Sequence, residues 1–172
     1  MRQTYRNVAR VVKTHGRFGE VLVEPLQGLP FVVREGLSVA LTPPGLKRDR
    51  FCRVEHLTPL VDGALVSFSG IETLGSAERI VGCYLLVAES DVYLGALDIA
   101  YSELIGRSVH DGRHGDLGVI TEVMDTPAND VWVVNGSFGE VLIPVVETVV
   151  DHVPREGAIE VHIMDGLLDA NA

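Results

Sequence analysis

Long apolar runs are missing from this chain. No stretch approaches the roughly 20 apolar residues that a helix needs to cross a bilayer. Met1 is followed by polar and basic residues instead of the apolar core of a signal peptide. Hydrophobic residues make up 47% of the chain and charged residues 22%, which is ordinary for a globular protein. The sequence therefore predicts a cytoplasmic protein with no membrane partner.

Cysteine is also scarce. Cys52 and Cys83 are the only two, and their separation is not typical of a metal site. Thiols persist in a reducing compartment, where disulfides are rare. We expect two buried thiols, and a disulfide between them is the alternative that the sequence leaves open.

Recognisable catalytic motifs are absent. The chain has no serine in a nucleophile elbow and no Gly-Lys-Ser/Thr phosphate loop. His110 and His114, with Asp111 and Asp116 beside them, are the best metal candidates, but intervening glycines make this segment a turn. An acid/base pair of carboxylates requires a specific distance between the two carboxyl groups. The separation of the many carboxylates along the sequence does not establish that distance. We expect no catalytic residue, no metal, no cofactor and no small-molecule substrate.

Positive charge is rare in the second half of the chain. Residues 1–90 hold 11 Lys and Arg against 9 Asp and Glu, a net charge of +2. Residues 91–172 hold 3 against 15, a net charge of −12, and the whole chain carries −10. The first half can therefore lie near phosphate, which repels the second half. The acidic half serves either solubility or the attraction of a basic protein.

The stretch from Val8 to Pro25 organises the first half. Two runs rich in valine and leucine flank a polar tip with two glycines, at His15 to Gly19, which predicts a β-hairpin. A basic amphipathic helix is the alternative, because cations recur every three or four residues. The valines and the glycine pair are poor in a helix, so the hairpin is preferred. The recurring cations are Arg2, Arg6, Arg10, Lys13 and Arg17.

Further strand patterns follow. Residues 30–41 predict a strand, a turn at Glu35-Gly36 and a second strand, and residues 51–71 predict more strands. Thr73 is a helix cap, Gly82 can end that helix, and residues 83–87 form a closing strand. About six strands and one short helix in some 90 residues are typical of a small closed barrel.

A loop rich in proline and glycine at residues 42–50 carries a second group of cations. Lys47, Arg48 and Arg50 are expected on its exposed tip, where they either contact RNA phosphates or are simply solvated.

Residues 91–98 read as a linker with apolar side chains that pack between domains or against a partner. Tyr93 and Tyr101 are either binding anchors or packing residues.

The second half is also rich in strand patterns. Ser102 to Gly106 predicts one helical turn with a Ser102 cap, and Asn135-Gly136 predicts the turn of a hairpin. Trp132 is expected in the core. Residues 145–153 are ambiguous between strand and helix, and residues 158–164 predict a last strand. This pattern indicates a second small β unit.

Five segments follow one another in a recognisable order: VVKTHGRFGEV at 11–21, GIETLGSAERIVGCYLLV at 70–87, SELIGRSVHDGRHGDLGVI at 102–120, GEVLIPVVETVV at 139–150 and GLLD at 166–169. Together they resemble the RimM family of bacterial ribosome maturation factors. The resemblance implies an all-β chain with one or two short helices: an N-terminal six-stranded β-barrel at residues 1–90 and a C-terminal PRC-barrel domain at residues 99–172.

The resemblance also implies a function. RimM-like proteins bind the free 30S subunit, contact ribosomal protein uS19 and assist 16S rRNA maturation and head assembly as non-enzymatic chaperones. A monomer is expected. The family places adjacent aromatics before the segment that matches Ser102–Gly106, and the corresponding residues here are Ile99, Ala100 and Tyr101, so only one aromatic remains.

Combining the resemblance with the charge pattern gives two candidate sites. Ile99, Ala100 and Tyr101 are expected to contact the ribosomal protein. Two alternatives from other functional classes remain: a flavin- or nucleotide-binding β-barrel enzyme, and a general acidic interaction module. The residues expected to contact RNA are Lys13, His15, Arg17, Lys47, Arg48 and Arg50.

Overall fold

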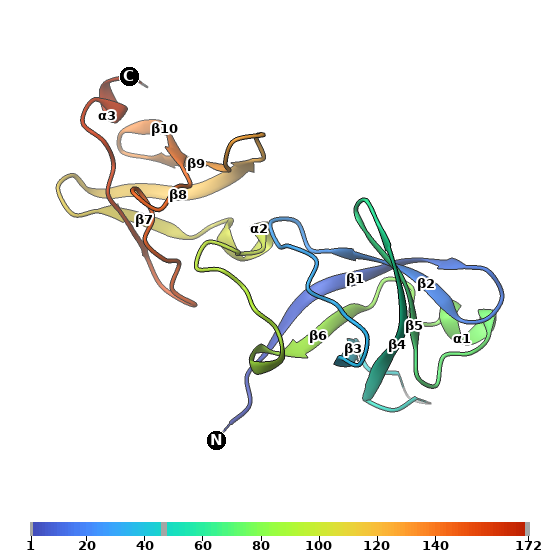
Figure 1. Cartoon of the computed structure of the whole chain (residues 1–172). Helices are drawn as coiled ribbons and strands as arrows, with labels where there is room; N and C mark the ends of the chain where they lie inside the picture. The colour runs from blue at the N-terminus through green and yellow to red at the C-terminus, as the bar shows by residue number, and fades with distance from the viewer. Residues whose placement is uncertain (1, 46–47, 171–172) are drawn as a thin grey trace. The chain divides into compact units, whose positions relative to one another are not determined.

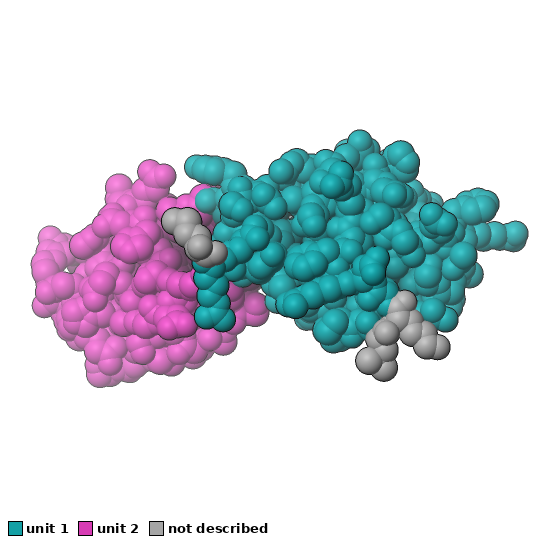
Figure 2. All heavy atoms as spheres, turned by 90° about the horizontal axis from the view of Figure 1, so that it is seen from below, with its two compact units in different colours: residues 1–94 teal, residues 95–172 magenta. Residues whose placement is uncertain are grey.

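The computed structural model describes residues 2–45 and 48–170. It divides into two compact units, Met1–Leu94 and Gly95–Ala172, which are coloured separately in Figure 2. The boundary divides the predicted linker, and each part packs on its own unit: Val92 lies against the first core, and Leu97 lies against the second. Tyr93 is exposed.

The first unit is a closed barrel of six strands in the order β1-β2-β5-β4-β3-β6 (Figure 1). All neighbouring strands are antiparallel, and β1 closes the barrel by pairing with both β2 and β6. The predicted six-stranded barrel is therefore confirmed. Its strands are β1 (Tyr5–His15), β2 (Glu20–Pro25), β3 (Ser38–Thr42), β4 (Phe51–Leu60), β5 (Gly63–Phe68) and β6 (Tyr84–Ala88).

Strand β1 contains two irregularities, which explain its helix-like spacing of cations. Its register shifts between Asn7 and Ala9 against β6, and between Val11 and Lys13 against β2. A bulge adds one residue to a strand and so shifts the alternation of its side chains. As a result Arg10 and Lys13, three residues apart, are both exposed while Val11 between them is buried. The predicted hairpin is confirmed.

The helix α1 (Leu74–Glu78) follows the barrel strands β1 to β5. The Thr73 hydroxyl accepts a hydrogen bond from the Ser76 N–H at 3.1 Å, and the Ser76 hydroxyl accepts one from the Thr73 N–H, which completes a capping box. The predicted Thr73 cap is confirmed. The helix ends at Glu78 with Arg79 as C-cap, so the prediction that Gly82 ends it is wrong.

One predicted strand does not form. Residues 30–36 make no strand, although Val33 is buried and Phe31 and Val32 pack against the barrel core. A closed barrel leaves no strand edge free for another partner. These residues therefore bury apolar surface without joining the sheet. The predicted turn at Glu35-Gly36 is present.

The second unit contains a five-stranded sheet in the order β10-β9-β8-β7-β11. Strand β11 runs parallel to β7, and the other pairs are antiparallel. Trp132 is fully buried in the core, as predicted. The elements are α2 (Tyr101–Leu104), β7 (Ser108–Asp111), β8 (Gly115–Met124), β9 (Val131–Gly136), β10 (Gly139–Pro144), β11 (Ile159–Val161) and α3 (Leu167–Ala170), and a 3₁₀ turn (Glu89–Asp91) precedes them in the first unit.

Three local predictions for this unit need correction. The N-cap of helix α2 is Ala100, two residues before the predicted Ser102, and it makes no side-chain cap bond. Residues 145–153 form neither strand nor helix, and the last strand is shorter than the predicted residues 158–164.

The turn of the β9–β10 hairpin lies two residues beyond the predicted one. Asn135 and Gly136 are paired within the strands, and the turn is Ser137-Phe138. Gly136 is needed for another reason: a Cβ on it would lie 2.3 Å from the Leu117 carbonyl oxygen. The absence of a side chain at Gly136 therefore permits β8 and β9 to approach closely.

Replacing Gly136 by Ala is expected to lower the free energy of unfolding by about 1–3 kcal/mol, because the added methyl group forces the two strands apart. The fluorescence of Trp132 during urea unfolding reports this unit. Gly112→Ala is the control, since a Cβ there meets nothing within 4 Å. Equal midpoints for the two variants would contradict the steric explanation.

Asp111 is the buried charged side chain of the second unit. Its carboxylate accepts hydrogen bonds from the N–H groups of Arg113 (3.0 Å), His114 (3.0 Å) and Ile163 (3.1 Å), and lies 2.8 Å from His114 Nδ1. Burial alone raises the pKa of Asp111, but the His114 contact and the backbone donors outweigh it and lower the pKa to about 2. The carboxylate thus ties the β7–β8 turn to the segment after β11.

Asp111→Asn is expected to lower the stability of this unit by about 1.5–3 kcal/mol at pH 7. Because the folded pKa is about 2 and the ordinary value is 3.8, the stabilisation is present above pH 3.8 and disappears as pH falls toward 2. Urea unfolding at a series of pH values should therefore show the variant and the parent converging in acid. The exposed Asp116→Asn serves as control, and a difference that persists below pH 2 would refute the role of the charge.

Candidate functional site

Two cation-bearing segments lie at the same end of the barrel. Strand β1 ends and β2 begins at the hairpin tip, residues 16–19. The pairings Val21–Val66 and Val54–Phe68 bring the start of β2, the end of β5 and the start of β4 to the same end. Figure 1 shows α1 beside the hairpin tip. We refer to the exposed cations Lys13, Arg17 and Arg50, with the exposed His15 between them, as the basic end.

The hairpin tip presents its side chains to solvent. Lys13, His15 and Arg17 are exposed, as expected for RNA contact. Within residues 2–45 and 48–170, neither Lys13 nor Arg17 takes part in a salt bridge, whereas His15 Nε2 lies 3.7 Å from Glu20 Oε1. Phe18 is 84% exposed beside them. Phe18 was not among the predicted site residues, although an aromatic residue between two glycines of a polar hairpin tip is a recognisable sequence signal.

The second cation segment differs from the prediction. Lys47 lies outside the described residues. Arg48 is only partly exposed, and its guanidinium donates to the Pro43 carbonyl oxygen at 2.7 Å and lies 3.4 Å from that of Leu41. The expectation that Arg48 is exposed at the loop tip is therefore wrong, because its hydrogen bonds to these carbonyl oxygens hold the side chain against the barrel. Arg50 is exposed, with its guanidinium 5.8 Å from the centre of the Phe51 ring.

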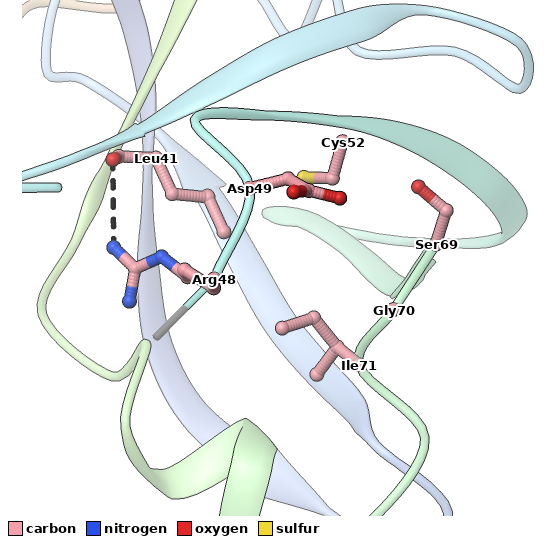
Figure 3. Close-up of a pocket in the computed structure, with 7 residues that line it drawn as sticks. All are labelled: Leu41, Arg48, Asp49, Cys52, Ser69, Gly70 and Ile71. Atoms are coloured by element: carbon pink, nitrogen blue, oxygen red, sulfur yellow. Dashed lines mark hydrogen bonds between the residues drawn. The ribbon is translucent and has the colours of Figure 1, made fainter. Parts of the chain in front are cut away.

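A hollow of about 440 Å³ lies behind this loop (Figure 3). Both cysteines are free thiols, and Cys52 lines this hollow. Burial raises the pKa of Cys52 to about 11, although the charge of Arg48 acts in the opposite direction. The thiol is therefore protonated and a poor nucleophile near neutral pH. Figure 3 shows the Arg48 guanidinium directed at Leu41. The hollow therefore provides a surface for packing, and its Cys52 thiol is not activated for catalysis.

Tyr101 is the centre of a different site in the second unit. Burial, and then the neighbouring Asp130 carboxylate and the charge of Asp125, raise the pKa of Tyr101 to about 12. The phenol is therefore a neutral hydrogen-bond donor beside two acidic residues. We refer to Tyr101, Asp125 and Asp130 as the tyrosine site.

The two residues before Tyr101 are less available. Ala100 is 2% exposed and forms the N-cap of α2, so its side chain cannot reach a partner in this structure. Ile99 is partly buried and packs against the core of its unit. Of the three residues expected to contact a ribosomal protein, only Tyr101 offers a polar group.

Arginines of the second unit support its own backbone. Arg107 donates to the carbonyl oxygens of Pro154 at 2.8 Å and Gly157 at 2.9 Å. Arg113 donates to the Ile163 carbonyl at 2.8 Å and pairs with Asp165 at 2.7 Å. These two arginines therefore hold backbone segments of the unit together, and Arg113 also pairs with one of the exposed carboxylates.

The histidines singled out as metal candidates point to separate carboxylates. His110 Nδ1 lies 2.9 Å from Glu160 Oε2, and this contact raises the pKa of His110. His114 instead faces Asp111. In the described part of the chain, no group of three or more His, Cys, Asp or Glu is placed to hold a metal ion. Nor is any helix there long and apolar enough to traverse a bilayer.

Family models match both units of the chain. The RimM N-terminal domain model matches residues 7–92, and the RimM PRC barrel domain model matches residues 101–167. The chain belongs to the RimM family. The resemblance found in the sequence is thereby confirmed, and so is the combination of an N-terminal RimM barrel with a C-terminal PRC barrel domain.

RimM proteins from several bacteria match the chain over nearly its full length. One from Thermoanaerobacter sp. (strain X514), named ribosome maturation factor RimM, is 32% identical over 165 residues, covering 95% of this chain and 98% of that protein. One of the same name from Shouchella clausii is 36% identical over 169 residues, with coverage of 95% and 96%. The solved N-terminal domain of RimM from Thermus thermophilus is 17% identical, with a TM-score of 0.42, and covers 55% of this chain and 98% of its own.

Removing the charge of Asp130 by Asp130→Asn is expected to lower the pKa of Tyr101 from about 12 toward the ordinary value of 10. The reason is that an anion beside a phenol disfavours its ionised form. Nuclear magnetic resonance titration of the tyrosine rings measures this shift, with Asp116→Asn at the other end of β8 as control. A Tyr101 that titrates with the other tyrosines in the parent protein would contradict the described contact.

Proposed function

We propose that this protein assists maturation of the small ribosomal subunit as a non-enzymatic chaperone. The observation that carries the proposal is the family match across both units, to relatives named ribosome maturation factors. The free 30S subunit is the binding partner, and 16S rRNA maturation and assembly of the 30S head are the steps assisted.

The basic end is the RNA-contacting surface in this proposal. Lys13, Arg17 and Arg50 are exposed cations from two segments that converge at one end of the barrel. Each contact between a cation and a phosphate releases counterions, which gives affinity that declines as salt rises. Arg48 is left out of this surface because its guanidinium is bound by backbone carbonyls.

The tyrosine site is the contact for a basic ribosomal protein, for which we propose uS19. Tyr101 supplies a phenol, and Asp125 and Asp130 supply negative charge beside it. The wider unit is strongly acidic, so it attracts a basic partner over a distance set by the Debye length, about 8 Å at physiological salt. Ile99 adds apolar surface at the edge, whereas the buried Ala100 contributes no side-chain contact.

Chaperoning in this scheme requires no covalent chemistry. Binding shifts an assembly intermediate toward one conformation by at most the difference in affinity between its conformers. The protonated Cys52 and the separation of the histidines onto different carboxylates support a binding role over catalysis.

Replacing Lys13, Arg17 and Arg50 together by Ala is expected to weaken co-sedimentation with free 30S subunits. If the three cations contact phosphates, the slope of log affinity against log salt should become shallower by about 2, at about 0.7 per contact. Arg2→Ala is the control, because it precedes the start of β1 at the opposite end of the barrel.

Two results would overturn this proposal at different levels. An unchanged salt slope in the triple variant would exclude the basic end as the RNA contact. Failure of the parent protein to co-sediment with free 30S subunits would exclude the ribosomal role as a whole.

A further inference from the structure

Phe18 is an exposed aromatic residue that the proposed function does not use. It lies at the tip between β1 and β2, next to Arg17, and is 84% exposed. A phenylalanine ring usually contributes to a core, where it buries a large apolar area. Here the ring is exposed to solvent at the tip of the β1–β2 hairpin.

The backbone around Phe18 is anchored. Gly19 is buried, and a Cβ on it would lie 2.1 Å from the Ile71 carbonyl oxygen, so the chain there lies directly against the segment after β5. Gly16, on the other side of the tip, has a φ of +68°, and a Cβ there would meet nothing. The tip is therefore fixed on one side and open on the other, and it presents Phe18 and Arg17 outward.

A hollow of about 310 Å³ adjoins the ring. Its lining combines the Phe18 ring and the Arg17 guanidinium with the Glu20 carboxylate, which lies 3.7 Å from His15 Nε2. The lining residues are His15, Gly16, Arg17, Phe18, Glu20 and Ser67.

The opposite end of the barrel provides a contrast. There the β4–β5 hairpin exposes Val61 at 98%, next to Leu60 and Asp62. That tip is aliphatic and acidic, whereas the tip with Phe18 carries an aromatic ring among cations. Lys13 and Arg17 have no salt-bridge partner in residues 2–45 and 48–170, so their charges remain available.

We infer that the Phe18 ring stacks on an unpaired RNA base while Arg17 and Lys13 contact the phosphates of the same strand. Bases within a duplex have their faces covered by their neighbours, so a stacking side chain selects single-stranded segments. Every base has such a face, so little sequence preference is expected. This inference rests on the proposed function for the identity of the partner, RNA. It adds that the bound RNA is single-stranded and that Phe18 is the residue that recognises it.

The test measures binding of the full chain to a fluorescent single-stranded RNA oligonucleotide and to an RNA duplex of equal length, over a series of salt concentrations. Phe18→Ala is expected to reduce single-strand affinity roughly 5- to 100-fold at every salt concentration, without changing the salt slope. Phe18→Tyr should retain most of the affinity because it keeps an aromatic face.

Two control variants separate stacking from charge. Lys13→Ala with Arg17→Ala should make the salt slope shallower by about 1.4, at about 0.7 per phosphate contact. Val61→Ala at the opposite end should bind as the parent does. Duplex binding should be weaker and insensitive to Phe18→Ala.

The stacking role is overturned if Phe18→Ala binds the single strand as tightly as the parent, or loses duplex and single-strand affinity equally. It is also overturned if the variant loses co-sedimentation with 30S subunits while keeping its RNA affinity, because the tip would then contact protein. Loss of 30S co-sedimentation by the parent, with Phe18-dependent RNA binding retained, would instead remove the proposed function and leave the stacking role standing.

Discussion

Closure of the first barrel depends on strand β1, which pairs with both β2 and β6. Closure leaves no strand edge open, and it requires a strand long and twisted enough to serve two neighbours. The two register shifts in β1 supply extra twist, and they also turn Arg10 and Lys13 to the same outer surface. The feature that completes the fold thus also arranges the cations that lead to the hairpin tip.

Charged side chains have different roles in the two units. At the basic end, Lys13, Arg17 and Arg50 remain exposed while Arg48 is committed to backbone carbonyls. In the acidic unit the roles are reversed, since Arg107 and Arg113 hold backbone segments together and the carboxylates stay on the surface. One buried carboxylate, Asp111, is the exception and serves the fold.

The family, the strand-rich fold class, the first hairpin and the Thr73 cap could be predicted from the sequence, because each depends on local sequence patterns. Features that depend on contacts between distant segments could not be predicted. Closure of the barrel excluded the strand expected at residues 30–34, and close approach of β8 and β9 required Gly136 inside a strand where a turn was expected. The candidate site was incomplete for the same reason: contacts distant in sequence buried Ala100 and bound Arg48, and they anchored the tip that exposes Phe18.

The central claim is that the chain meets the small ribosomal subunit through the basic end and the tyrosine site. Hydrogen exchange measured by mass spectrometry, on the full chain alone and bound to free 30S subunits, tests this claim most directly. The account requires slower exchange on binding at the hairpin tip, residues 16–19, and in the loop at residues 125–130 that carries two members of the tyrosine site. Protection confined to the β4–β5 tip around Val61, or no protection at either site, would contradict it.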